Sequence, residues 1–232
     1  MRLDDWGQIG EVDCLKSESS SRIQERILIL DFGSQYTQVI ARRVREAHVF
    51  SEIVPHTISV GEVLSLRPRG IILSGGPASV YAPRAPKMDR GIFHLGIPIL
   101  GICYGMQLLV KEFGGEVARG TRREYGRGIL RRCRASALLG GLPKNLEIWN
   151  SHGDRVTRLP KGFESIATTE NSPYAVVRRE NIYGLQFHPE VSHTPRGKEI
   201  LASRFLPNPI SLRVLPTMMD FSGTISGNFS IA

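Results

Sequence analysis

The stretch ILGICYGMQLL, residues 99–109, joins two patterns that belong to different kinds of secondary structure. Its apolar beginning is typical of a buried strand, and MQLLVKEF (106–113) repeats apolar residues at helical spacing. Cys103 lies between them, flanked by Gly101 and Gly105. Two glycines at a strand-to-helix junction allow a sharp turn and remove side chains that would block the sulfur. The stretch therefore predicts a strand–turn–helix unit with a cysteine presented at the turn.

Strand and helix patterns alternate on both sides of this unit. Apolar, strand-like runs are expected at 26–31, 49–54, 70–76 and 97–102, and helices at 34–47, 59–67 and 106–113. After Gly115, short β-like pieces follow one another with turn residues between them, and a last helix pattern covers 195–206. We therefore expect an α/β fold, with an open, mostly parallel central sheet, helices on both of its faces and a smaller antiparallel sheet.

Composition places the chain among globular proteins. It has 232 residues, of which 41% are hydrophobic and 22% charged, enough for one domain with a sizeable core. The three cysteines, Cys14, Cys103 and Cys133, are too widely spaced for a disulfide framework or a zinc pattern. A reducing cytoplasm is the simplest setting for a free Cys103 thiol.

The two ends of the chain differ in character from its middle. Residues 1–25 carry scattered charges and no apolar segment of a signal peptide, so we expect a disordered leader. We place one domain at 26–206 and a poorly ordered tail of different composition at 207–232. No apolar stretch approaches the roughly 20 residues that cross a bilayer, so we expect a protein that does not meet the membrane.

The formal net charge of +8 raises the question of an acidic partner. Seven arginines fall between Arg119 and Arg134, yet Tyr125 is the only aromatic residue among them and no nucleic-acid motif surrounds them. A solvated basic face is the interpretation we favour over a nucleic-acid site. An acidic protein surface or a phosphate-bearing ligand would fit equally well.

Cysteine at the strand-to-helix turn suggests a nucleophile. The start of the following helix favours the thiolate form of Cys103, and the turn leaves the backbone N–H of Tyr104 free for a developing oxyanion. Gly76, in SGGP (74–77) at the end of another expected strand, is a candidate for the second N–H donor. A buried structural cysteine is the alternative that this pattern alone leaves open.

A candidate base occurs in YGLQFHPEV (183–191). His188 and Glu190 are two positions apart, so on an extended chain they share one face, and the carboxylate could orient the imidazole. Because Pro189 has no N–H to donate, we expect the strand to end or to lie at a sheet edge there, with both side chains exposed. Only His188 combines an expected strand end with an acid two positions later, so the other histidines are weaker candidates for the base: His48, His56, His94, His152 and His193.

Together these segments resemble the class-I, triad-type glutamine amidotransferases, and within that family most of all the glutaminase part of GMP synthetases. The matching segments are ILILDFGSQYTQVIARRVRE, IILSGGPASVYAP, GIPILGICYGMQLL, SHGDRV and YGLQFHPEVSHT, from Ile27 to about Ile200. The resemblance implies a seven-stranded central mixed sheet with flanking helices and a smaller antiparallel sheet. It also implies hydrolysis of glutamine to glutamate and ammonia through a cysteinyl thioester, with the ammonia used to aminate xanthosine monophosphate to GMP.

Residue roles follow from the same resemblance. It makes Cys103 the nucleophile, His188 the acid and base and Glu190 the residue that orients it, with Gly76 and Tyr104 as backbone oxyanion donors. The residues that fall where the family holds the amino-acid end of glutamine are Gln107, Ser151, Gly153 and Asp154. No metal or cofactor is implied for glutamine hydrolysis. ATP and Mg²⁺ are expected only on an ATP-pyrophosphatase subunit or domain, whose S-G-G-x-D-S loop does not occur in this sequence.

Two other functions remain compatible with the sequence. One is a non-catalytic or regulatory module of the same fold, against which the presence of all three triad residues argues. The other is a cysteine hydrolase of small amides that has no ammonia acceptor, against which the SHGD and HPEVSHT segments argue.

Overall fold

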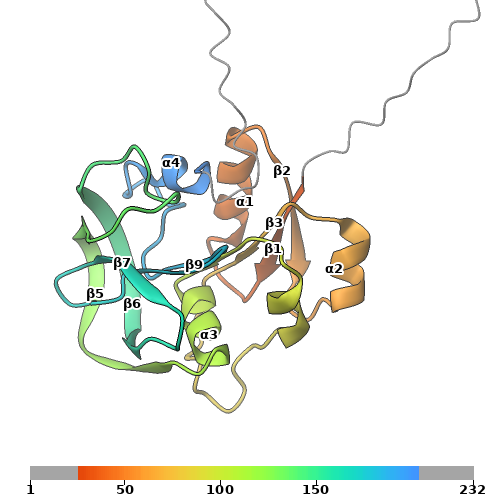
Figure 1. The fold of residues 1–232 in the computed structure, drawn as a ribbon, viewed down its shortest axis with the longest axis horizontal. Coiled ribbons are helices and arrows are strands. Elements are labelled where there is room, and N and C mark those ends of the chain that lie inside the picture. The colour runs from red at the N-terminus through yellow and green to blue at the C-terminus, as the bar shows by residue number, and fades with distance from the viewer. Residues whose placement is uncertain (1–25, 204–232) are drawn as a thin grey trace, which may run out of the picture.

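The structure, a computed structural model, describes residues 26–203 and, among them, all side chains except those of residues 121–123. These residues form a nine-stranded mixed sheet with the strand order β2-β1-β3-β4-β9-β8-β7-β5-β6 (Figure 1). The expected segments 1–25 and 207–232 lie outside the described residues, as does the end of the helix expected at 195–206. Among the described residues, no helix has both the length and the apolar character of a membrane span.

One half of the sheet is parallel. Its strands are β1 (Arg26–Asp31), β2 (Phe50–Pro55), β3 (Gly70–Leu73), β4 (Ile99–Ile102) and β9 (Ile182–Leu185). Each adjacent pair in the order β2-β1-β3-β4-β9 is parallel. All residues of β3, β4 and β9 are buried, as apolar strands covered on both faces must be. The predicted α/β fold is confirmed here.

Two apolar clusters cover the two faces of this half. Alternate residues of β1 divide between them, Ile27 and Ile29 on one face and Leu28 and Leu30 on the other. The first face packs against α1 (Thr37–Glu46) and α4 (Gly197–Leu201), which lie side by side in Figure 1. The second packs against α2 (Val60–Leu66), the 3₁₀ turn η1 (Arg90–His94) and α3 (Tyr104–Glu112). Because helices cover both faces of the parallel half, the carboxyl ends of its strands are the places left for a binding site.

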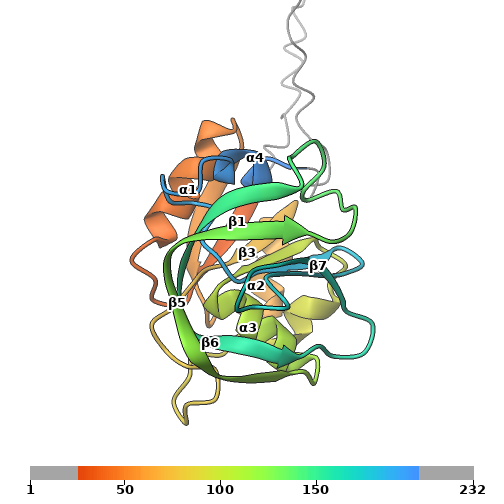
Figure 2. The same ribbon diagram turned by 90° about the vertical axis from the view of Figure 1, so that its left-hand side faces the viewer.

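The other half is antiparallel. Strand β8 (Val176–Arg179) pairs with β9 and with β7 (Glu164–Thr168), while β5 (Glu116–Arg132) and β6 (Asn145–Arg158) form a long ribbon. This ribbon curves across the view in Figure 2. It joins β7 through two residue pairs at its end, which involve Arg131 and Arg132. The expected seven-stranded sheet and smaller antiparallel sheet are therefore hydrogen-bonded into one.

The arginine-rich stretch lies mostly on β5, which runs unbroken for 17 residues where the sequence predicted short pieces. Its side chains have different neighbours. Arg127 pairs with Glu147 and Arg134 with Glu164, whereas Arg132 donates to the carbonyl of Leu139. Four of the described arginines, Arg119, Arg127, Arg131 and Arg134, are exposed, and Arg132 is partly buried.

Candidate active site

Cys103 lies in the sharp turn between β4 and α3, with φ 51° and ψ −103°. Such a positive φ is costly for a residue with a Cβ, and here the surrounding backbone enforces it. A Cβ on Gly101 would lie 2.7 Å from the backbone of Gly105, and one on Gly105 would lie 2.4 Å from the carbonyl oxygen of Leu73. The two glycines therefore let the start of α3 pack directly on β3 and β4, and this contact fixes the cysteine.

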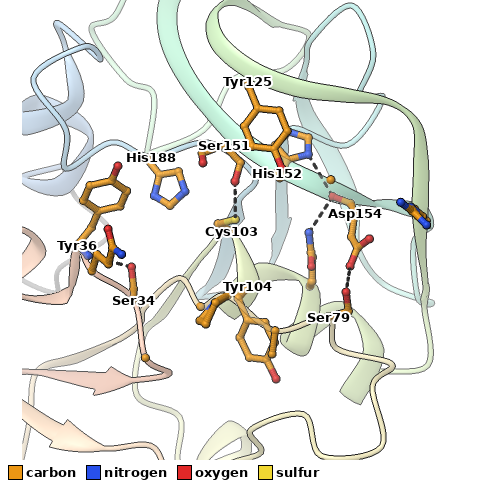
Figure 3. A pocket seen from close by; sticks show the side chains of 18 of the residues that line it. Ser34, Tyr36, Ser79, Cys103, Tyr104, Tyr125, Ser151, His152, Asp154 and His188 are labelled. Carbon is orange, nitrogen blue, oxygen red and sulfur yellow. Dashed lines mark hydrogen bonds between the residues drawn. The ribbon is translucent and has the colours of Figure 1, made fainter.

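A pocket of about 650 Å³ opens at this turn. Its lining comes from the carboxyl ends of β3 and β4, from the start of α3 and from the β5–β6 ribbon, and it includes Cys103, Gln107, Ser151, Gly153, Asp154 and His188. Figure 3 shows these segments around one cavity. The Cys103 side chain is only 7% exposed, yet it faces this cavity. It is therefore not sealed in packed hydrocarbon.

His188 and Glu190 meet as a side-chain pair. The Nδ1 atom of His188 lies 2.6 Å from Oε1 of Glu190. Because an ionised carboxylate only accepts hydrogen bonds, Nδ1 carries the proton and Nε2 is left for the pocket. The structure thus brings the sequence-predicted base and its orienting acid together.

The expected exposure of these two residues is wrong. His188 is 4% and Glu190 0% exposed. The strand does end early, since β9 stops at Leu185, but it lies in the middle of the sheet with β4 and β8 as neighbours. The HPE segment is covered by α4, because a Cβ on Gly197 would lie 1.8 Å from the carbonyl oxygen of Pro189.

Backbone contacts hold the His188 ring in place. The N–H of His188 donates to the carbonyl of Trp149 on β6, and the Thr194 hydroxyl donates to the carbonyl of His188. Tyr36 packs edge-on against the imidazole with 5.4 Å between ring centroids. A Cβ on Gly75 would lie 3.3 Å from Cε1 of His188, so this glycine allows the close approach of the SGGP loop.

Opposing effects set the protonation of His188. Burial disfavours the charged imidazolium, while hydrogen bonds with Cys103 and Glu190 and the negative charge of Glu190 favour it. The favourable contacts prevail and raise the pKa of His188 to about 10. The ring is therefore cationic at neutral pH when it faces Cys103.

A chain of amides connects the sulfur with the ribbon. Nε2 of Gln186 donates to Sγ of Cys103 at 3.9 Å, and Nε2 of Gln107 contacts Oε1 of Gln186 at 3.3 Å. The same Gln107 nitrogen donates to the carbonyl of Asp154 at 2.9 Å. Gln186 did not emerge from the sequence, where it looks like one more strand residue before HPE.

Gly76 and Tyr104 both line the pocket beside Cys103. A Cβ on Gly76 would lie 2.8 Å from the carbonyl oxygen of Phe32 and 3.3 Å from Cγ of Tyr104. Only glycine therefore brings this loop so close to the first residue of α3. As the first residue of a helix, Tyr104 has a backbone N–H with no acceptor within the helix.

The four residues expected at the amino-acid end of glutamine all line the pocket, but they differ in what they can offer. Gln107 is buried, and its amide nitrogen already donates to protein oxygens. Ser151 places its carbonyl 3.9 Å from the Cys103 sulfur. The carboxylate of Asp154 accepts from Ser79 Oγ at 2.6 Å and from the Tyr81 hydroxyl at 2.8 Å.

Ser79 and Tyr81 are pocket residues that the sequence analysis missed. Both follow the SGGP loop, in ASVYAP, and no pattern singles them out. They reach Asp154 across more than seventy positions of sequence, so only the folded chain shows the contact.

A second histidine–glutamate pair lies in the ribbon. Nε2 of His152 lies 3.0 Å from Oε2 of Glu124, and both residues are buried. Thr169 donates to the other oxygen of Glu124 at 2.9 Å. Burial alone would raise the pKa of Glu124, but hydrogen bonds from His152 and Thr169 lower it overall. The sequence analysis treated His152 only as a weaker base candidate and did not find Glu124.

Within residues 26–203, no group of three or more His, Cys, Asp or Glu side chains could hold a metal ion.

Comparisons with known proteins agree with this geometry. A model of the class-I glutamine amidotransferase family matches residues 28–208. The glutamine-hydrolyzing GMP synthase of Aquifex aeolicus is 55% identical over 179 residues, which cover 76% of this chain and 35% of the relative. That of Thermomicrobium roseum is 52% identical over 177 residues, covering 76% and 34%. The chain thus spans about a third of the length of these curated relatives.

Solved structures show the same architecture. A candidate GMP synthase subunit from Thermoplasma acidophilum superposes with a TM-score of 0.71 at 30% identity, covering 79% of this chain and 92% of that one. A glutamine amidotransferase from Thermotoga maritima gives a TM-score of 0.60 at 23% identity, covering 72% and 77%. The second likeness shows the fold alone. The family resemblance noted in the sequence is confirmed.

Proposed function

Because the chain belongs to the class-I glutamine amidotransferases, we propose that it hydrolyses the side-chain amide of glutamine to glutamate and ammonia. The observation that carries the proposal is the convergence of Cys103 and His188 in one pocket, with Glu190 behind the imidazole. A nucleophile, a base and an orienting acid in this order form a catalytic triad.

The first half-reaction forms an acyl-enzyme. The Cys103 thiolate attacks the side-chain amide carbon, and the carbonyl oxygen becomes an oxyanion. The backbone N–H groups of Gly76 and Tyr104 stabilise that charge. The imidazolium of His188 then gives its Nε2 proton to the leaving nitrogen, so the C–N bond breaks, ammonia departs and a glutamyl thioester remains.

The second half-reaction returns the enzyme to its starting state. Neutral His188 takes a proton from water as the water attacks the thioester carbon. The C–S bond breaks, glutamate leaves, and the Cys103 thiolate again faces an imidazolium. Glu190 keeps the ring oriented throughout and favours its cationic form. Thiolate and imidazole supply the nucleophile and the protons, so this step of the proposal uses no cofactor.

The charges of the pocket support an amino acid as the substrate. Among the described residues that line the pocket, Asp154 is the single Asp or Glu, and Arg119 is the single Lys or Arg. The two are direct partners across the β5–β6 ribbon. An anion beside a cation matches the ammonium and carboxylate groups at the α-carbon of glutamine. Gln107, Ser151 and Gly153 complete this end of the pocket in the proposal.

The names of the relatives support a more specific role. We place this glutaminase with an ATP-pyrophosphatase subunit or domain that uses the ammonia, ATP and Mg²⁺ to convert xanthosine monophosphate to GMP. A reduced Cys103 thiol fits a cytoplasmic location.

The test combines turnover with labelling. We expect the purified chain to release glutamate from glutamine, faster when a synthetase subunit loaded with xanthosine monophosphate, ATP and Mg²⁺ is added. A glutamine-like electrophile should modify Cys103, as read by peptide mass spectrometry. Labelling without any response to the synthetase would favour a hydrolase of small amides. A chain that neither releases glutamate under either condition nor reacts at Cys103 would contradict the proposal.

A further inference from the structure

The buried pair of Glu124 and His152 is not used by the triad chemistry, although it borders the same pocket. His152 lies on β6 and Glu124 on β5, and they are cross-strand partners in the ribbon. His152 lines the pocket and Glu124 lies behind it. Oε2 of Glu124 and Nε2 of His152 lie 3.0 Å apart, and neither atom has a hydrogen-bond partner of good geometry among the described residues. Each is therefore costly to bury unless it interacts with the other.

Contacts at both ring nitrogens hold His152. Nδ1 lies 3.1 Å from the carbonyl oxygen of Asp154, which can only accept, so Nδ1 is the donor in that contact. Nε2 lies 3.0 Å from Oε2 of Glu124. Thr169 donates to the other oxygen of Glu124, which holds the carboxylate in place. Glu124 thus meets one nitrogen of the ring while the other nitrogen meets the backbone of Asp154.

One of the two contacts of His152 is with the backbone of Asp154. The carbonyl of Asp154 accepts from His152 and from Gln107 Nε2 at 2.9 Å. Its carboxylate accepts from Ser79 and Tyr81. Both the backbone carbonyl and the carboxylate of Asp154 are thus held by hydrogen bonds. Within residues 26–203, Asp154 is the single Asp or Glu in the pocket lining. An anion fixed in this way is suited to a substrate ammonium group.

We propose that Glu124 and His152 form a buried pair that positions Asp154 for the α-ammonium group of the substrate. The inference rests on the proposed glutaminase function, and it makes Glu124 and His152 positioning residues that do not take part in bond breaking. The pair acts through the backbone of Asp154. Its loss should weaken recognition of the α-ammonium group while Cys103 and His188 keep their reactivity.

The decisive experiment compares two ligands that differ only in this group. Cys103→Ala prevents turnover, and calorimetry in this background measures Kd for glutamine and for 4-carbamoylbutanoate, which has hydrogen in place of the ammonium group. We expect Glu124→Gln to raise Kd for glutamine about tenfold, as for a weakened charge-assisted contact. The analogue should change less than about twofold. Glu147→Gln, which makes the same chemical change at an exposed pair on the same ribbon, should alter neither.

Two further measurements separate positioning from damage. With Cys103 intact, Glu124→Gln should raise KM for glutamine about tenfold and leave kcat within about threefold. Alkylation of Cys103 by iodoacetamide, which has no amino-acid end, should keep its rate within about twofold. Equal losses for both ligands, or slower alkylation, would overturn the inference in favour of general disruption, and unchanged Kd values would overturn it as well. If the Cys103→Ala parent binds neither ligand, the proposed glutamine site itself fails.

Discussion

The parallel half of the sheet and the β5–β6 ribbon both reach the pocket, and each carries a histidine paired with a glutamate. In the parallel half, His188 and Glu190 are two positions apart and the cysteine turn is marked by glycines. In the ribbon, His152 and Glu124 are 28 positions apart and come together only because β5 and β6 pair. In the proposed function, the first pair serves the Cys103 sulfur, whereas the second holds the segment proposed to meet the substrate. The proposal therefore assigns reactivity and recognition to different parts of one sheet.

Removing the Cys103 sulfur should give the largest loss of activity, and it tests whether the parallel half carries the reactive group. Cys103→Ala is expected to lower kcat for glutaminase by about 10⁴-fold or more, as for loss of a triad nucleophile. Glutamate release measures it. Cys133→Ala is the matched control, since that exposed cysteine lies outside the pocket. Comparable activity in both variants would refute the assignment.

Removing the charge behind His188 should come next. Glu190→Gln is expected to lower kcat/KM by roughly 10²–10³-fold, because the amide no longer stabilises the imidazolium. Hydrogen bonds with Cys103 and Glu190 and the Glu190 charge raise the pKa of His188 to about 10 against the effect of burial. Losing the Glu190 carboxylate therefore lowers that pKa, and the imidazolium is lost at lower pH.

The pH profile of this variant tests the cause directly. The high-pH limb of kcat/KM should move to lower pH in Glu190→Gln. A reduced rate with an unshifted high-pH limb would mean that Glu190 acts by packing alone.

The glycine contacts of the cysteine turn predict a loss of stability of intermediate size. Gly105→Ala places a Cβ 2.4 Å from the carbonyl oxygen of Leu73, and should lower the free energy of unfolding by about 2–3 kcal/mol. Urea unfolding measures it. Gly61→Ala has open space around its new Cβ in helix α2, so it should stabilise by about 0.5–1 kcal/mol. Equal effects at the two glycines would count against the close-contact explanation.

The smallest of these effects is expected for substrate binding near Asp154. Ser79→Ala removes one of two side-chain donors to the Asp154 carboxylate, and should raise KM for glutamine about three- to tenfold with little change in kcat. Steady-state glutaminase kinetics measure it. Ser65→Ala, which removes an exposed hydroxyl on α2, should leave KM unchanged. A fall in kcat without a rise in KM would assign Ser79 to the reactive half instead.

The accuracy of sequence-based prediction differed between the two regions. In the parallel half, short apolar strands and intervening helices have strong periodicities, so their order was predicted correctly. In the second half, the sequence predicted short β-like pieces where β5 forms one strand of 17 residues. Gly126 and Gly128 lie in this strand and pair with Asn150 and Ile148 of β6, and such cross-strand pairing is not visible in a local pattern.

Local sequence patterns were enough to predict the strand–turn–helix unit around Cys103 and the His188–Glu190 partnership, whereas the family came from a resemblance to known proteins. These features depend on neighbouring residues, whose geometry local backbone rules constrain. Three further features required the folded chain: the burial of His188 and Glu190, the contacts of Ser79 and Tyr81 with Asp154, and the support that Glu124 gives His152. Those contacts join residues distant in sequence, and strand pairing and packing, which no local pattern encodes, bring them together.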